Sequence, residues 1–172
     1  MHMVILALVC ATDESEALDR AEEVFNKLVE DEVFDYYTMF RPADTSTVGG
    51  RARWGPIPAV IPALSDAGQK LIEEGMKATR DQFLANLLRL RTELARHSDD
   101  ELCDPTDPLS MFDYYARCVG EREGPNTWVY DQDGCGIHGT KQLQQTFKNY
   151  REQIEAATLK IAVWVVPVDV HS

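Results

Sequence analysis

The sequence lacks any apolar run that approaches the ~20 residues required by a membrane-spanning helix. The apolar start, residues 3–11 (MVILALVCA), is too short. It has no basic region before it and is followed at once by acidic residues, so it does not resemble a secretory signal. Met1 and His2 have the pattern of a cloning remnant, with Met3 as the natural start. We therefore expect a cytoplasmic protein that does not bind membranes.

Basic residues are few: the 172 residues include 17 Lys and Arg against 29 Asp and Glu, for a net charge of −12. This balance excludes broad, non-specific binding to nucleic acid, which needs a basic surface. The acids gather in two segments, 13–35 with ten acids against Arg20 and Lys27, and 99–113 with six acids and no base. We expect solvated surfaces there. The alternative is an acidic inhibitor that mimics nucleic acid, or a face that docks a basic partner.

Cysteines are also few, and catalytic signatures are missing. The four cysteines, Cys10, Cys103, Cys118 and Cys135, match no disulfide framework, and a chain of this size does not require one. A zinc site from Cys103, Cys118, Cys135 and His138 is left open. Only Cys135 and His138 have the tight spacing that structural zinc sites usually show twice. The chain has no Gly-x-Ser-x-Gly segment and no Gly-Lys-Ser/Thr phosphate loop. These absences favour a protein that is not an enzyme and has no cofactor, although a divalent metal stays open.

The apolar pattern predicts four strands and four helices. Residues 3–11 are apolar on both faces, as a central buried strand should be. Asp13 and Glu16 have the spacing of a helix capping box. Strands are predicted at 3–11, 35–40, 127–131 and 159–170, and helices from Asp13 to about Glu32, from Ser65 to about His97, from Leu109 to Val119 and from Thr140 onward. Residues 41–63, with many Gly and Pro, are predicted to form a loop.

This order reads β-α-β, then a helical insertion at 64–119, then β-α-β. It predicts a single α+β domain over residues 1–172 with a ferredoxin-like split βαβ sheet and the insertion between its second and third strands. The first strand is expected at the centre, and Pro167 places the last strand at an edge. An apolar edge strand and the leucine stripe of the long helix both need covering, so we expect a homodimer.

Carboxylates and imidazoles are expected to gather at one edge of this sheet. In a split βαβ sheet the ends of the third and fourth strands meet the start of the second. That edge collects Asp35, Asp131, Asp133, His138, Asp169 and His171. Such groups can hold a divalent metal or act as an acid–base pair, which suggests a metal-dependent phosphoesterase. The alternative is that Asp131 and Asp133 form a turn and that Asp169 and His171 are a solvated terminus.

The opposite edge is expected to carry a second candidate site, in the loop at 41–63. Its candidate ligand-binding residues are Arg41, Gly49, Gly50, Arg51, Arg53 and Trp54. Glycines let the backbone approach an anion, arginines can fork onto phosphate or carboxylate, and a tryptophan can stack on a base. The alternative is a packed tryptophan with arginines paired to the acidic helix.

Three segments also carry a resemblance. The strand "DYY", the loop "GGRARW" and the closing "VVPVDVH" are similar to segments of small uncharacterised phage and mobile-element proteins. The resemblance implies a phage or mobile-element context and brings no activity with it. We therefore predict a non-enzymatic accessory protein that binds a partner protein or a small anionic, nucleotide-like ligand. The phosphoesterase and the acidic inhibitor are the alternatives.

Overall fold

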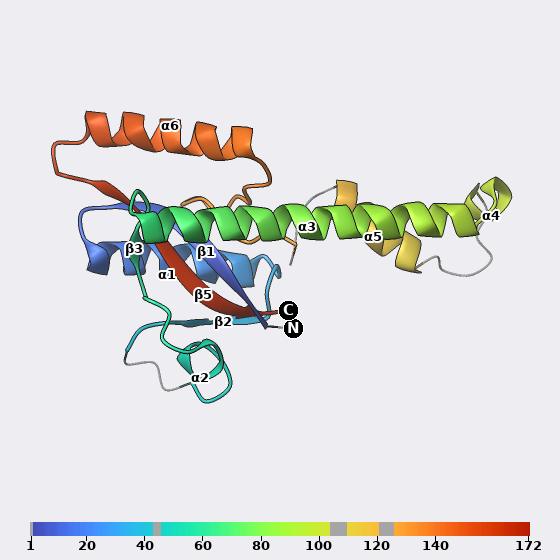
Figure 1. Ribbon diagram of the computed structural model, residues 1–172, viewed down its shortest axis with the longest axis horizontal. Coiled ribbons are helices and arrows are strands. Elements are labelled where there is room, and N and C mark those ends of the chain that lie inside the picture. The colour runs from blue at the N-terminus through green and yellow to red at the C-terminus, as the bar shows by residue number, and fades with distance from the viewer. Residues whose placement is uncertain (1, 43–45, 104–109, 121–125) are drawn as a thin grey trace.

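The computed structural model describes residues 2–42, 46–103, 110–120 and 126–172. It shows an α+β protein with a mixed five-stranded sheet and six helices (Figure 1). The elements are β1 (His2–Ala11), α1 (Glu14–Glu30), β2 (Tyr36–Met39), α2 (Arg51–Trp54), β3 (Ile61–Pro62), α3 (Asp66–Arg96), α4 (Asp99–Cys103), α5 (Ser110–Gly120), β4 (Val129–Tyr130), α6 (Thr140–Ala156) and β5 (Ala162–His171). Within these ranges no helix is long and apolar enough to cross a membrane.

The two ends of the chain form the centre of the sheet. β1 and β5 pair antiparallel along their whole length, from His2 opposite His171 to Ala11 opposite Ala162. The strand order is β2-β5-β1-β4, and the short β3 also pairs with β5. Nearly all residues of both strands are buried, because helices cover both faces of this pair. The predicted central position of the first strand is confirmed.

The predicted edge position of the last strand is wrong, and the sheet does not have the ferredoxin-like order. β5 lies between β1 and β2, and the third predicted strand, β4, pairs parallel with β1 at the edge. β5 offers ten residues to β1, whereas β4 has only two. Pro167 is tolerated in this inner strand because neither neighbour on its outer side pairs with it: β2 pairs with β5 as far as Val168, and β3 pairs with β5 from Val165. No backbone N–H is therefore required from residue 167 on that side.

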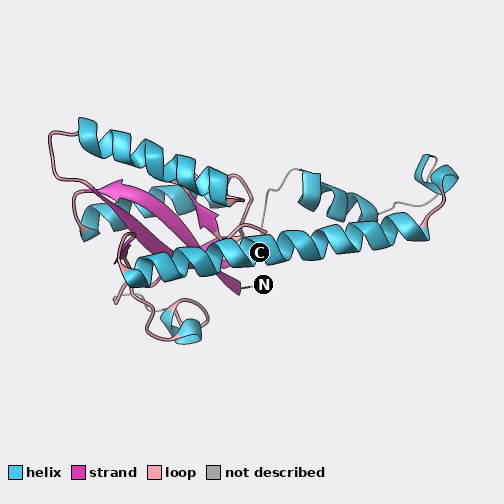
Figure 2. Cartoon of the chain, turned by 45° about the horizontal axis from the view of Figure 1, so that its top comes forward, coloured by secondary structure: helices cyan, strands magenta, loops and turns pink. Residues whose placement is uncertain are grey.

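Two apolar layers lie on opposite faces of the sheet, and helices lie on both of its sides (Figure 2). Alternate residues of a strand point to opposite faces. Ile5 and Val9 therefore pack with α1, whereas Leu6 and Leu8 pack with α3 and α6. The capping box predicted for α1 is confirmed: the Asp13 side chain accepts a hydrogen bond from the Glu16 N–H.

α3 serves both the core and a projecting arm. The helix runs for 31 residues, about 46 Å, close to the predicted Ser65 to His97. Its first half packs on the sheet through buried positions that include Gly68, Ile72 and Gly75. Its second half leaves the body and is accompanied by α5, so that α3, α4 and α5 form an arm (Figure 1).

We predict that Gly68→Ala destabilises the protein, although alanine is the better helix former by about 1 kcal/mol. A Cβ at position 68 would lie 2.3 Å from the Pro62 carbonyl oxygen, and backbone cannot move aside cheaply. Overpacking of this kind costs about 1–3 kcal/mol. Chemical denaturation should show this loss, whereas Gly120→Ala, which meets nothing within 4 Å, should leave the free energy of unfolding unchanged or slightly higher. Equal behaviour of the two variants would contradict the close approach.

Candidate functional site

The pairing of β1, β5 and β2 gathers polar side chains at one end of the sheet. His171 lies opposite His2 on one side and Tyr36 on the other, and Asp169 lies opposite Val4 and Thr38. Directly opposite residues share a face of the sheet, and so do residues two apart on one strand. Toward Leu6 and Leu8, this face of the sheet is covered by α3 and α6. At the end that carries His2 and His171, the segment 46–50 covers it.

Asp169 is the buried centre of this cluster, with only 1% of its surface exposed. Both of its carboxylate oxygens lie 3.1 Å from Nδ1 of His2, and because a carboxylate only accepts, the imidazole is the donor. The backbone N–H of Gly50 donates to Oδ2 at 2.8 Å. A buried carboxylate is costly unless it is hydrogen-bonded, and these contacts supply the bonds. Asp169 is therefore not part of a solvated terminus.

The close approach of the Asp169 carboxylate explains why positions 49 and 50 of the loop are glycine. A Cβ at Gly49 would lie 2.9 Å from Asp169 Oδ2 and 3.1 Å from Thr38 Oγ1, so a larger residue would push the loop off the sheet. Gly50 has φ of 55° and ψ of −130°, a conformation that favours glycine. The loop backbone does approach an anion here, but that anion is the protein's own Asp169, which occupies the Gly50 N–H. The loop lies at the same end as Asp169, and its predicted place at the opposite edge is wrong.

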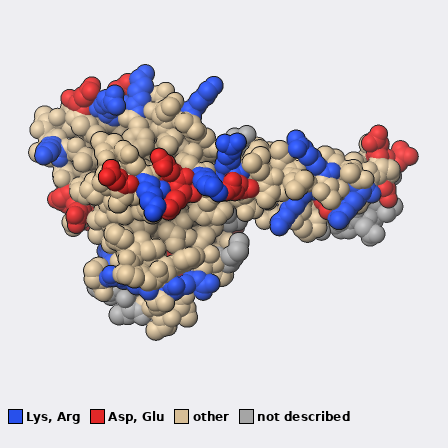
Figure 3. Space-filling view, viewed as in Figure 1, with Lys and Arg blue, Asp and Glu red and all other residues tan. Residues whose placement is uncertain are grey.

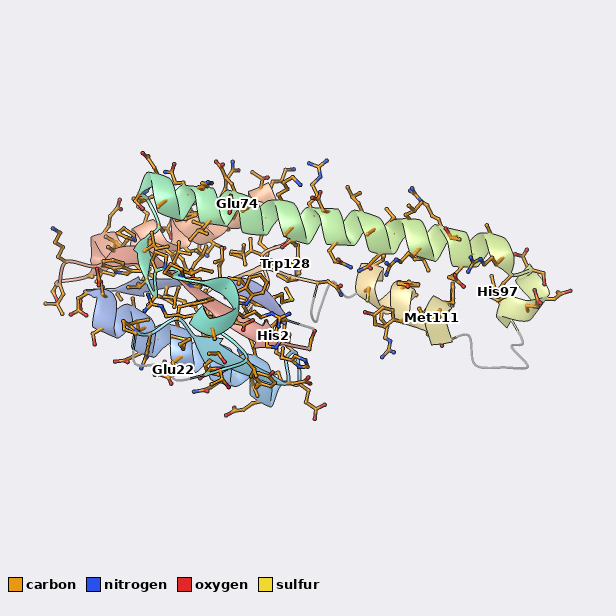
Figure 4. All side chains as sticks on the ribbon, turned by 60° about the horizontal axis from the view of Figure 1, so that its bottom comes forward. His2, Glu22, Glu74, His97, Met111 and Trp128 are labelled. Atoms are coloured by element: carbon orange, nitrogen blue, oxygen red, sulfur yellow. The ribbon has the colours of Figure 1, made fainter. Side chains whose placement is uncertain are left out.

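A second imidazole–carboxylate pair stands beside the first. Nδ1 of His171 lies 2.7 Å from Oδ2 of Asp35, and the Tyr36 ring stacks on the His171 ring with centroids 5.0 Å apart. The rings of His2 and His171 meet edge to face, also at 5.0 Å. The structure therefore brings Asp35, Asp169 and His171 together as predicted, and adds His2 (labelled in Figure 4).

The arginines of the loop divide into two groups. Arg41 is bound to α1, with Nη2 at 2.9 Å from Glu22 and 3.6 Å from Asp19. This is the pairing with the acidic helix that was the alternative for this loop. It also neutralises part of the acidic surface that a nucleic-acid mimic would need. Arg51 and Arg53 are both exposed on α2. The Arg53 guanidinium lies 5.9 Å from the centre of the Trp54 ring. Basic side chains are visible on the lobe that carries α2 (Figure 3).

The structure places Asp131, Asp133 and His138 far from this cluster. The predicted shared edge required the third strand to run antiparallel to β1, but β4 runs parallel and pairs Tyr130 with Ala7. Asp131, the residue after Tyr130, therefore lies level with Leu8 of β1, about 20 Å along the sheet from His2. Its Oδ1 accepts from the N–H groups of Asp133 at 3.0 Å and Cys135 at 2.9 Å, which is the turn given as the alternative.

The zinc hypothesis gains no support from the geometry. In the part of the chain that the structure describes, no group of three His, Cys, Asp or Glu side chains is placed to hold a metal ion. Cys103 ends α4 on the arm, whereas Cys135 lies in the turn after β4. Burial, and then the negative charge of Asp131, raise the pKa of the Cys135 thiol, which opposes a role as a nucleophile.

His2 is the residue that sequence reasoning missed. The sequence around it has the pattern of a cloning remnant, yet His2 is the first residue of β1 and a direct partner of Asp169. Only the register of β1 with β5 shows that position 2 faces position 171. The available signal was weak: one histidine stands just before the first long apolar run, at position 2, and another stands just after the last, at position 171.

We predict that Asp169→Ala frees the loop from the sheet. The change leaves the Gly50 N–H without its acceptor, which costs about 1–3 kcal/mol. Denaturation should show that loss, and limited trypsin digestion should cut faster after Arg51 and Arg53. Asp35→Ala is the matched control, because Asp35 is exposed and bonds His171 rather than the loop. Unchanged trypsin cleavage in Asp169→Ala would show that the carboxylate does not hold the loop.

Comparison with known proteins gives a family but no activity. No curated protein and no solved structure matches the chain. One protein family does match, and the match extends over residues 1–172, from the first residue of the chain to the last. The chain therefore belongs to the family described as Domain of unknown function (DUF7995).

Proposed function

We propose that the protein is a non-enzymatic accessory protein that binds an anionic ligand or partner through Arg51, Arg53 and Trp54. One observation carries the proposal: these three side chains are exposed together on a short helix whose preceding residue, Gly50, is fixed to the buried carboxylate of Asp169. A loop fixed in this way holds the backbone that carries these side chains in place before the ligand arrives. Less conformational freedom is then lost on binding.

The chemistry of the three residues suits anions. Arginine forms paired hydrogen bonds with carboxylate or phosphate, and tryptophan supplies a flat apolar surface for a base or an apolar side chain. Tryptophan and arginine are also the residues most often found at the energetic centre of protein interfaces. Trp54 keeps 41% of its surface exposed. This arrangement favours a contact across an open surface, with a phosphate group or a run of acidic residues as the counterpart.

The site is smaller than the sequence predicted. Arg41 is held by Glu22 and Asp19 of α1, and the N–H of Gly50 is held by Asp169. Recognition is therefore left to side chains rather than to a backbone nest. The protein carries a net charge of −12, so an anion approaches against the overall field and gains attraction only near the arginines.

We predict that the double substitution Arg51→Ala with Arg53→Ala removes anion binding without unfolding the protein. Charge-assisted hydrogen bonds contribute about 1.5–3 kcal/mol each, so loss of two weakens binding by about two to four orders of magnitude. Calorimetry against a panel of nucleotides and a polyglutamate peptide measures this. The control is Lys70→Ala with Lys148→Ala, which makes the same change in net charge on α3 and α6.

The outcomes of that calorimetry separate the alternatives. Binding that survives the arginine substitutions places the site elsewhere and contradicts the proposal. Equal weakening in the lysine control assigns the effect to net charge rather than to these two arginines. If wild type binds the peptide and no nucleotide, the ligand is an acidic segment of a protein. If wild type binds neither probe, the proposal loses its anion-binding basis.

A second candidate function is favoured by the two neighbouring imidazole–carboxylate pairs. His2 with Asp169 and His171 with Asp35 place two potential proton carriers side by side, with ring centroids 5.0 Å apart. One imidazole can accept a proton while the other donates one, which is what hydrolysis of a phosphodiester needs. This revised phosphoesterase hypothesis uses His2 and His171 and leaves out Asp131, Asp133 and His138.

The second candidate predicts hydrolysis of bis(4-nitrophenyl) phosphate that depends on His171. Loss of a general acid or base lowers the rate about 10²–10⁴-fold, so His171→Gln should lose that much. Asp131→Asn, at the other end of the sheet, should keep the wild-type rate. The release of nitrophenolate is measured with and without Mg²⁺, Mn²⁺ or Zn²⁺. Absence of turnover in wild type removes this candidate, and loss of activity in Asp131→Asn contradicts the revised site.

A further inference from the structure

The arm has one covered face and one exposed face. Arg89 lies on the side of α3 that faces α5, where it donates a hydrogen bond to the Tyr115 hydroxyl at 3.3 Å, and Phe83, Leu87 and Leu90 are partly buried. Successive residues of a helix are rotated by about 100° about its axis. Leu84 and Leu88, which follow Phe83 and Leu87 in the sequence, therefore point to a different side of α3. There Leu84 is 48% exposed and Leu88 is 65% exposed. Two adjacent leucines on the projecting part of α3 (Figure 1) thus form an apolar strip that the described part of the chain leaves largely exposed.

Charges of opposite sign stand at the two ends of this strip. Asp81 lies one turn before Leu84, and Arg91 lies one turn after Leu88. Asp81 is bound to Lys77 on its own helix, yet its side chain is 56% exposed. Arg91 is exposed, and the described residues offer it no hydrogen bond or ion pair. The strip therefore reads acid, leucine, leucine, base along the helix.

We propose that this strip is the interface between two copies of the chain, packed antiparallel about a two-fold axis at the level of Asn86. Leu84 and Leu88 lie two residues to either side of Asn86, and Asp81 and Arg91 lie five residues to either side. The axis therefore sets Leu84 against the partner's Leu88 and Asp81 against the partner's Arg91. Each contact occurs twice, as a two-fold interface requires.

The charge pattern selects this arrangement over others. Parallel packing would set Asp81 against the partner's Asp81 and Arg91 against the partner's Arg91, and like charges in contact repel. A different protein could also cover two leucines, but it would have no reason to match a pattern that is symmetric about one residue. Self-complementarity is what identifies a second copy as the occupant. The charged residues flank the apolar seam much as e and g positions do in paired helices.

The size of the contact sets its strength. The strip and its flanks extend over residues 77–95, about 28 Å of helix. A single pair of helices of this length lies at the small end of specific interfaces, below about 1,200 Å² in total. We therefore expect a dimer that forms at micromolar concentrations and dissociates on dilution. The contact lies on the arm, away from Arg51 and Arg53, so this inference is independent of the proposed anion site.

Sedimentation equilibrium between about 1 and 100 µM tests the interface. Wild type should dimerise in this range. Asp81→Arg and Arg91→Asp each replace two attractive contacts per dimer by repulsive ones. Loss of two exposed ion pairs alone should raise the dissociation constant about 2- to 30-fold, and the new repulsion should raise it further. The control is Asp100→Arg, the same change in charge at the tip of the arm, which should dimerise as wild type does.

Mixing the two weakened variants gives the decisive measurement. In a mixed pair the two substituted side chains face each other with opposite charges, and the native Arg91 of one chain faces the native Asp81 of the other. Both contacts are thus attractive again, and a 1:1 mixture should form heterodimers with the affinity of wild type. Misfolding of either variant would not produce this recovery. A wild-type monomer at 100 µM, unchanged self-association of the single variants, or a mixture that stays monomeric would each overturn the proposal.

Discussion

The antiparallel pairing of β1 with β5 is the constraint on which the rest of the molecule depends. These strands come from the two ends of the chain and match along all ten residues of each. Closing so long a loop costs entropy, which the burial of two nearly continuous apolar strands offsets. The register also fixes chemistry. A slip of one residue would turn Asp169 to the other face of the sheet, against α1, and separate it from His2 and Gly50.

Asp169 transmits this register to the loop. A carboxylate with 1% exposure needs donors, and the loop provides one from Gly50 while Gly49 leaves the space for it. The glycines that resembled an anion-binding loop therefore serve an internal anion. With the Gly50 N–H occupied, the anion site that we propose relies on the side chains of Arg51, Arg53 and Trp54. One buried group thus links the sheet, the shape of the loop and the surface it presents.

The sequence predicted those features that depend on local pattern. Residues 3–11 are apolar on both faces and form a central strand, Asp13 and Glu16 cap α1, and the helix after Ser65 has nearly the predicted length. It did not predict the order of the sheet. β4 has only two residues, so nothing local states that it runs parallel to β1, and its direction decides where Asp131 lies. Pro167 predicted an edge strand for a similar reason. The sequence does not show that β2 and β3 leave residue 167 of β5 unpaired on the outer side.

The proposed anion site is compatible with the acidity of the protein because interactions between exposed charges are short-ranged. The net charge of −12 would repel an anion, but free charges separated by more than about 8 Å are largely screened at physiological ionic strength. Over shorter distances the nearest groups decide the field. On the lobe these are Arg51 and Arg53, whereas Arg41 is already neutralised by α1. On the arm the same screening limits Asp81 and Arg91 to groups in direct contact with them, as in the proposed dimer. Because each surface depends on its own few charges, the protein can be acidic as a whole and still bind through basic residues at one place.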